Sequence, residues 1–142
     1  MDLLKSWVIG AVAWIGISLI IGALITSLAT EAMLGSVGGR ILVDFLPALV
    51  TTACVAAAAA LLHPAPQRMN TSRHAAAALV VPALSIIANV VVIAVDGPVA
   101  VGILVGNVVA GVLGAFAGWR LADRVYASAE RRDASRGQTR DR

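Results

Sequence analysis

Residues 102–118 of the chain read GILVGNVVAGVLGAFAG, an apolar run in which a small residue recurs at every fourth position. A four-residue step keeps these positions on one face of a helix, where a missing side chain lets another backbone come close. In water each glycine would cost a helix about 1 kcal/mol relative to alanine, whereas in lipid the backbone has to satisfy its own hydrogen bonds and helix is strongly favoured. The stretch therefore predicts a membrane-spanning helix with a packing face made of Gly102, Gly106, Ala110, Gly114 and Gly118.

The composition of the whole chain agrees with a membrane protein. Of its 142 residues, 59% are hydrophobic and 13% are charged, and the mean hydropathy is +0.89. A soluble domain carries about a quarter charged residues, spread along its length. Here the charges fall in short islands, and the runs between them are long enough to cross a bilayer, which takes roughly 20 apolar residues. The composition therefore excludes an ordinary soluble domain.

Four apolar runs predict an all-α integral membrane protein with four transmembrane helices. We expect the spans at about 6–29, 40–62, 75–95 and 99–121, within a transmembrane domain of residues 1–123. The first run has no charged residue from Ser6 to Thr30, which is too long for the apolar core of a cleaved signal peptide, although Ser27-Leu28-Ala29 resembles a cleavage site. The first run is therefore expected to be an uncleaved span.

Helix-breaking residues separate the expected spans. Gly38 and Gly39 are expected to break the helix and let the chain reverse before the second span. Prolines at positions 64 and 66 end the second span, and Pro98 is well placed to begin the fourth helix. Residues 124–142 form a basic polar tail. We expect it to continue the last helix to about Arg132 and then to be disordered, because the remainder has too few apolar residues to fold.

The basic residues predict the orientation of the four spans. Of the 11 lysines and arginines, ten fall before the first span, between the second and third spans, or after the fourth, and only Arg40 falls on the other side. Cytoplasmic loops of membrane proteins carry the excess of lysine and arginine. Both termini and the middle loop are therefore expected to be cytoplasmic. One lysine against ten arginines, with abundant alanine and valine, is typical of a GC-rich bacterium, so we expect the bacterial cytoplasmic (inner) membrane.

Asp44 is the only acidic residue inside an expected span, and it allows two interpretations. An acid within the membrane indicates a proton or cation site. Asp44 also lies about one turn from the expected outer end of its helix, where a negative charge is favoured. Arg40, four residues earlier, would share its face and could form an interfacial ion pair with it. The structural interpretation is favoured over the transport interpretation on these grounds.

Asn89 and Asn107 add to this polar group, because both fall in the same half of the bilayer as Asp44 when counted from the helix ends. Thr51 and Ser85 lie somewhat deeper. Asp44, Asn89 and Asn107 are therefore a candidate polar site between the second, third and fourth spans. The simpler explanation is hydrogen bonding between helices, worth about 0.6 kcal/mol per bond in membranes, and the alternative is a small cavity for an ion or substrate.

The sequence predicts neither an enzyme nor a bound cofactor. It contains no nucleophile motif, phosphate loop or pair of catalytic carboxylates. His63 and His74 are read as interfacial residues, and with Cys54 they do not make a metal pattern. The excess of basic residues is explained by the orientation of the protein in the membrane, so no nucleic acid is expected as a partner. The expected partners are the lipid bilayer and other transmembrane helices, including a second copy in a homo-oligomer.

Three functions remain open from the sequence. The leading hypothesis is a small accessory or assembly protein of the bacterial inner membrane that acts through helix–helix contacts, because the glycine-rich face needs a partner. The second is a small dimeric transporter that uses Asp44, Asn89 and Asn107. The third is a phage-encoded holin or exclusion-type membrane protein, which the small size and the charged tail also fit.

Overall fold

The computed structural model describes residues 2–62, 71–95 and 101–140, and the side chains of most of them. In these ranges the chain is helical and contains no strand. Its elements are α1 (Asp2–Leu28), α2 (Glu31–Gly35), α3 (Val37–Arg40), the π-helical segment η1 (Ile41–Phe45), α4 (Leu46–Leu61), α5 (Thr71–Val95) and α6 (Val101–Arg140).

Four helical stretches are long and apolar enough to cross a membrane, which confirms the all-α class and the number of candidate spans. They are Leu3–Leu28, Val37–Leu61, Ser72–Val92 and Val101–Ala129. The second stretch begins at Val37, earlier than expected, because α3, η1 and α4 follow one another without a break. Four such helices indicate a multi-pass membrane protein.

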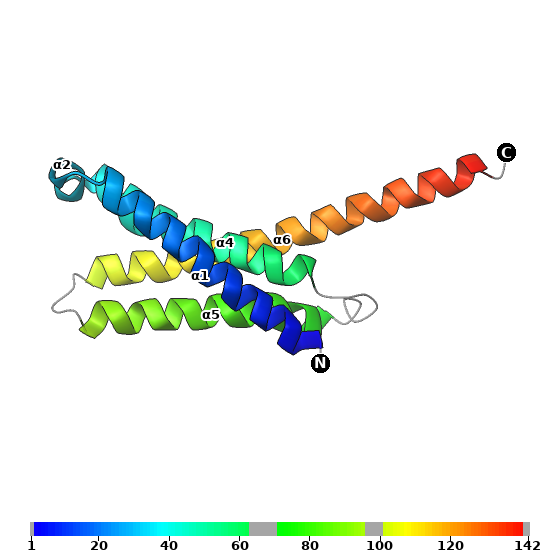
Figure 1. The fold of residues 1–142 in the computed structure, drawn as a ribbon, viewed down its shortest axis with the longest axis horizontal. Helices are drawn as coiled ribbons and strands as arrows, with labels where there is room; N and C mark the ends of the chain where they lie inside the picture. Colours follow the sequence, from blue (N-terminus) through cyan, green and yellow to red (C-terminus); the bar gives the residue numbers. More distant parts are fainter. Residues whose placement is uncertain (1, 63–70, 96–100, 141–142) are drawn as a thin grey trace.

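The long helices run alternately in opposite directions (Figure 1). The start of α1, the end of α4 and the start of α5 lie at one end of the molecule, which we call the N-terminal end. α2, the end of α5 and the start of α6 lie at the opposite end, which we call the α2 end. α4 is the central helix, because it packs against α1, α5 and α6.

The core is built from alanine. Its buried apolar side chains are Val55, Ala56, Ala59, Ala60, Ala77, Ala78, Val81, Ala110, Ala115 and Ala122. Helices in lipid gain little from burying large apolar side chains, since lipid tails are equally apolar, and small residues instead let the backbones approach. The larger apolar side chains accordingly point outward, among them Leu19, Leu84 and Leu113.

The connection between α1 and α4 differs from the expected glycine break. Thr30 and Ser36 are in extended conformation and cap α2 and α3 with their hydroxyl oxygens, which accept from the backbone N–H groups of Met33 and Gly39. Gly38 and Gly39 lie inside α3. The chain therefore changes direction at capping residues, because their side chains satisfy N–H groups that a helix start leaves open. Gly39 serves close packing, since a Cβ there would collide with the backbone of Met33.

The C-terminal helix is longer than expected. α6 continues past Arg132 to Arg140 and extends well beyond the other helices (Figure 1). The expectation of disorder rested on the scarcity of apolar residues in this segment. Residues 133–140 read DASRGQTR, in which the alanine, the glutamine and the two arginines are good helix formers and can prolong a helix that the bundle has already nucleated.

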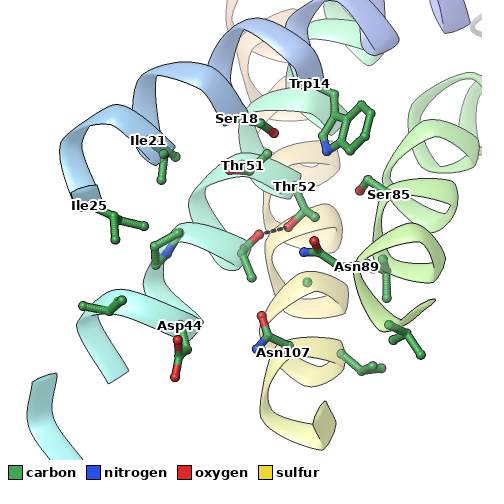
Figure 2. Close-up of a pocket in the computed structure, with 18 residues that line it drawn as sticks. Trp14, Ser18, Ile21, Ile25, Asp44, Thr51, Thr52, Ser85, Asn89 and Asn107 are labelled. Atoms are coloured by element: carbon green, nitrogen blue, oxygen red, sulfur yellow. Dashed lines mark hydrogen bonds between the residues drawn. The ribbon is translucent and has the colours of Figure 1, made fainter. Parts of the chain in front are cut away.

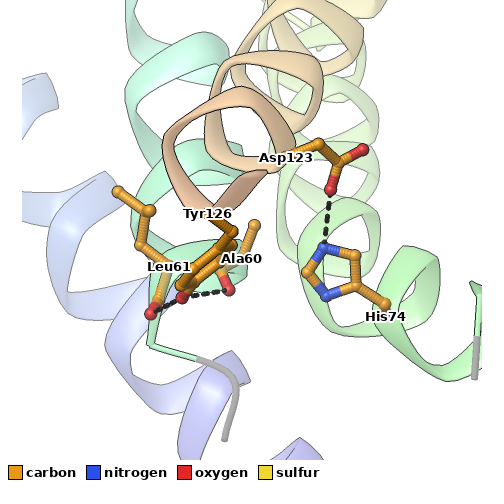
Figure 3. A network of polar contacts seen from close by, with 5 residues as sticks. All are labelled: Ala60, Leu61, His74, Asp123 and Tyr126. Carbon is orange, nitrogen blue, oxygen red and sulfur yellow. Dashed lines mark hydrogen bonds and ion pairs between the residues drawn. The ribbon is translucent and has the colours of Figure 1, made fainter. Parts of the chain in front are cut away.

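Polar contacts join the helices at the N-terminal end (Figure 3). His74 Nε2 on α5 lies 3.2 Å from Asp123 Oδ1 on α6. The Tyr126 hydroxyl on α6 donates to the Leu61 carbonyl at the end of α4, and Trp7 Nε1 on α1 donates to the Ala76 carbonyl on α5 at 3.2 Å. All four long helices are therefore connected at this end.

Candidate functional site

Toward the α2 end the helices enclose a partly open polar cavity of about 380 Å³ (Figure 2). α1 is close to α5 only in its N-terminal half, where a Cβ on Gly10 would lie 3.2 Å from Val81. Farther along, α1 crosses α4 obliquely and its end lies beside α2, away from the end of α5 (Figure 1). The cavity occupies this divergence, and α1, η1, α4, α5 and α6 all contribute to its lining.

The three residues that the sequence singled out as a candidate polar site all line this cavity. Asp44 comes from η1, Asn89 from α5 and Asn107 from α6. In Figure 2, Asp44 and Asn107 lie at one end of the cavity, and Asn89 lies between Asn107 and Thr52. Three helices that are distant in sequence thus bring one carboxylate and two amides to the same space.

The backbone around Asp44 explains how an acid reaches the cavity. Asp44 lies in the π-helical turn η1, and Pro47 follows at the first turn of α4. Proline has no N–H to donate and its ring crowds the carbonyl four residues earlier. A wider π turn relieves such crowding, and turns of this kind are common at functional sites. The turn carries Asp44 at the cavity wall.

The Asp44 carboxylate is half-buried, and it has no hydrogen bond or ion pair with any residue whose side chain the structure describes. The expected ion pair with Arg40 falls outside those residues, because the Arg40 side chain is not among them. A carboxylate that faces a cavity in an apolar bundle is costly unless a proton, a cation or hydrogen-bond donors compensate it.

The two amides differ in their hydrogen bonding. Asn107 Nδ2 donates to the Ile103 carbonyl at 3.3 Å, so the NH₂ group of this amide is bonded within α6. The Asn89 side chain is exposed and forms no hydrogen bond with a described residue. Among the described residues, neither amide forms a hydrogen bond to another helix. The interhelical hydrogen bond that was the simpler explanation from the sequence is therefore not formed by these two amides.

Hydroxyl groups line the deeper part of the cavity. Thr52 Oγ1 donates to the Ala48 carbonyl at 2.8 Å, and Ser85 Oγ donates to the Pro82 carbonyl at 2.7 Å. Each hydroxyl donates its hydrogen bond within its own helix and keeps lone pairs that can accept. Thr51 is also buried at the cavity wall. The cavity is therefore richer in acceptors than in donors.

Sequence reasoning missed the contribution of α1. Trp14 and Ser18 line the cavity together with Ile21, Gly22 and Ile25. A signal for Trp14 was present in the sequence, because it lies in the interior of the first span, whereas tryptophan in membrane proteins prefers the interfaces. The indole lies at the end of the cavity opposite Asp44 (Figure 2).

The glycine-rich face of α6 lies mainly against α4 of the same chain. A Cβ on Gly114 would collide with the Leu49 carbonyl, and one on Gly118 with the Ala53 carbonyl. A Cβ on Gly106 would meet the Phe45 ring, whereas Gly102 has nothing nearby. Ala110 is buried in the same row. The structure thus places four of these five small residues at a helix contact inside the chain and leaves Gly102 outside it.

The remaining metal-ligating side chains do not form a metal site in the described part of the chain. The described residues contain no group of three or more histidine, cysteine, aspartate or glutamate side chains that could hold a metal ion. Cys54 is exposed on the central helix. His63, one of the two histidines considered in the sequence, lies outside the described residues.

The fold and the cavity define a small helical multi-pass membrane protein with a polar chamber between its helices. Comparison of the chain with protein-family models, with curated proteins and with solved structures finds no match. The function therefore has to be argued from the cavity itself.

Proposed function

We propose that this protein is a small transporter of the bacterial cytoplasmic membrane that binds a positively charged solute in the polar cavity. The observation that carries the proposal is the position of Asp44, the only ionisable side chain among the described residues that line the cavity. It lines the same cavity as Asn89 and Asn107, which come from two other helices, and it has no partner among the described side chains.

The depth of Asp44 supports a binding role over a purely interfacial one. The helical stretch that contains it begins at Val37, which puts Asp44 about 10 Å along the helix axis at 1.5 Å per residue. An ionised group at such a depth is expensive, so it is retained where it serves a pathway or a ligand. A bound cation would neutralise the carboxylate, and the neighbouring amides would complete the hydrogen bonds of the carboxylate.

The orientation that the charges predict would put the cavity in one half of the membrane. Ten of the 11 lysines and arginines fall before the first expected span, between the second and third, or after the fourth, which favours both termini and the connection between α4 and α5 in the cytoplasm. The cavity lies toward the opposite, α2 end. In this orientation the solute is held in the outer half of the membrane.

The shape of the cavity supports a homodimer. A single chain leaves the polar chamber partly open where α1 diverges from α5. Polar groups that faced lipid through this opening would lack partners, which costs several kcal/mol per group. A second copy would cover the opening and complete the pathway, and four helices alone are few for a transport route.

An accessory protein that acts through helix contacts is the second candidate. Its main argument from the sequence was the glycine-rich face of α6, but Gly114 and Gly118 already lie against α4. What favours this candidate is α1, whose Gly16 lies outside the cavity, has open space around it and could admit another helix. No feature of the described residues favours the phage-encoded alternative.

Transport currents in proteoliposomes on a solid-supported membrane would test the proposal. We expect currents on addition of at least one monovalent cation from a panel of Na⁺, K⁺ and tetraethylammonium, or of larger organic cations. Asp44→Asn should abolish them. Glu31→Gln, which removes an exposed acid on α2 outside the cavity, should leave them unchanged. Equal currents from the wild type and Asp44→Asn, or none from any cation, would contradict the proposal.

A further inference from the structure

We infer that the solute of this cavity is a lipophilic organic cation with a single positive charge. The inference rests on the proposed function and narrows it to one chemical class. It follows from three properties of the described lining residues: one carboxylate, an apolar wall with an indole, and a volume far larger than a metal ion requires.

The charge of the lining sets the charge of the solute. Asp44 is ionisable, and every other described lining residue is a neutral polar or an apolar residue. One carboxylate balances one positive charge. A divalent metal ion such as Ca²⁺ takes six to eight oxygen ligands, usually with several carboxylates among them. The described lining residues offer one carboxylate, so a divalent ion would stay under-coordinated.

The size and the wall of the cavity exclude a bare monovalent ion as the best fit. A volume of about 380 Å³ lies within the usual range for small organic ligands, roughly 300–1,000 Å³. An alkali ion needs oxygen atoms on all sides, but much of this wall is aliphatic, with Ile21 and Ile25 on α1 and Ile86 and Val90 on α5. Such a wall favours a solute with an apolar body.

Trp14 gives the solute its orientation. Its indole lines the end of the cavity opposite Asp44, and the two asparagines lie nearer the carboxylate (Figure 2). A cation with an aromatic or aliphatic body could place its charge toward Asp44 and its body toward Trp14. Aromatic side chains recognise such ions through both stacking and the attraction of a cation to the ring face.

Tetraphenylphosphonium and tetraphenylborate make a suitable pair of probes, because they share one shape and carry opposite charges. Their binding to the purified, full-length protein in detergent can be compared by isothermal titration calorimetry. We expect saturable binding of tetraphenylphosphonium and no saturable binding of tetraphenylborate. This comparison uses the unmodified protein, so it does not depend on the folding of a variant.

Variants assign the binding to the cavity. Asp44→Asn should weaken tetraphenylphosphonium binding at least about tenfold, and Glu31→Gln should leave it unchanged. Trp14→Ala should weaken it roughly threefold to thirtyfold, with a smaller loss for Trp14→Phe. Trp119→Phe is the matched control, since Trp119 packs at the core outside the cavity. Its affinity should equal that of the wild type.

The outcomes distinguish a failure of the organic-cation inference from a failure of the proposed function. Equal binding of both probes, or binding that Asp44→Asn does not change, would overturn the organic-cation inference. If tetraphenylphosphonium does not bind but Na⁺ or K⁺ gives currents that need Asp44, the transporter proposal holds and the solute class is wrong. If no cation binds or gives a current that depends on Asp44, both are wrong.

Discussion

His74 Nε2 on α5 lies 3.2 Å from Asp123 Oδ1 on α6, across 49 positions of sequence. The pair lies at the N-terminal end, where Tyr126 also joins α6 to the end of α4 (Figure 3). At the α2 end, by contrast, α1 diverges and leaves the cavity. The bundle is thus held by polar contacts at one end and hollow toward the other, which is a suitable arrangement for a binding site that opens to one side.

Removing the His74–Asp123 contact should weaken the N-terminal end of the bundle by a modest amount. The His74 side chain is 7% exposed and that of Asp123 is 41% exposed, so water screens one partner. We expect a double-mutant cycle of His74→Ala and Asp123→Ala to give a coupling of about 0.5–1 kcal/mol in the free energy of unfolding. The cycle of His74→Ala with Glu31→Ala should be additive. A His74–Asp123 coupling near zero would show that the contact contributes nothing.

The orientation predicted from the charges can be tested by reporter fusions. Alkaline phosphatase fused after Arg142 should be inactive and green fluorescent protein at the same position should fluoresce, because cytoplasmic segments carry the excess of basic residues. A phosphatase inserted after Gly35, between α2 and α3, should be active. An active phosphatase at the C-terminus would reverse the orientation and place the cavity in the cytoplasmic half.

The sequence was sufficient for the number and the approximate bounds of the helices, because hydropathy reports directly on the length of an apolar run. It was insufficient for the connection before α4. Glycine pairs usually indicate a break, but here Thr30 and Ser36 cap the short helices and Gly39 is needed where two backbones meet. The approach of Gly39 to Met33 depends on the extended conformation of Ser36 between them, which the glycine pair does not indicate by itself.

The candidate site was predictable only in part. The depths of Asp44, Asn89 and Asn107 follow from counting residues along each span, and the structure places the three around one cavity. Counting does not give the rotation of each helix about its axis or the path of α1. The lining residues Trp14 and Ser18 depend on that path, since α1 reaches the cavity by crossing α4 obliquely. For this reason the cavity itself could not be derived from the sequence.

The small residues of α6 should differ in their tolerance of substitution, according to what lies opposite them. A Cβ on Gly118 would collide with the backbone of Ala53, which cannot move aside without shifting α4. A Cβ on Gly106 would meet only the Phe45 ring, which is a side chain and can rotate. Gly102 faces open space. The cost of an added side chain should therefore rise from Gly102 through Gly106 to Gly118.

Unfolding of the purified variants in detergent by increasing fractions of sodium dodecyl sulfate would measure this order. Gly118→Ala should lower the free energy of unfolding by about 1–3 kcal/mol, as overpacking of a tight contact usually does. Gly102→Ala should be neutral or stabilising by up to about 1 kcal/mol, because alanine is the better helix former. Gly114→Ile should be more damaging than Val109→Ile, since Val109 is 50% exposed and Gly114 lies against the Leu49 carbonyl. If Gly118→Ala matches Gly102→Ala, and Gly114→Ile matches Val109→Ile, then α6 does not pack on α4 through this face.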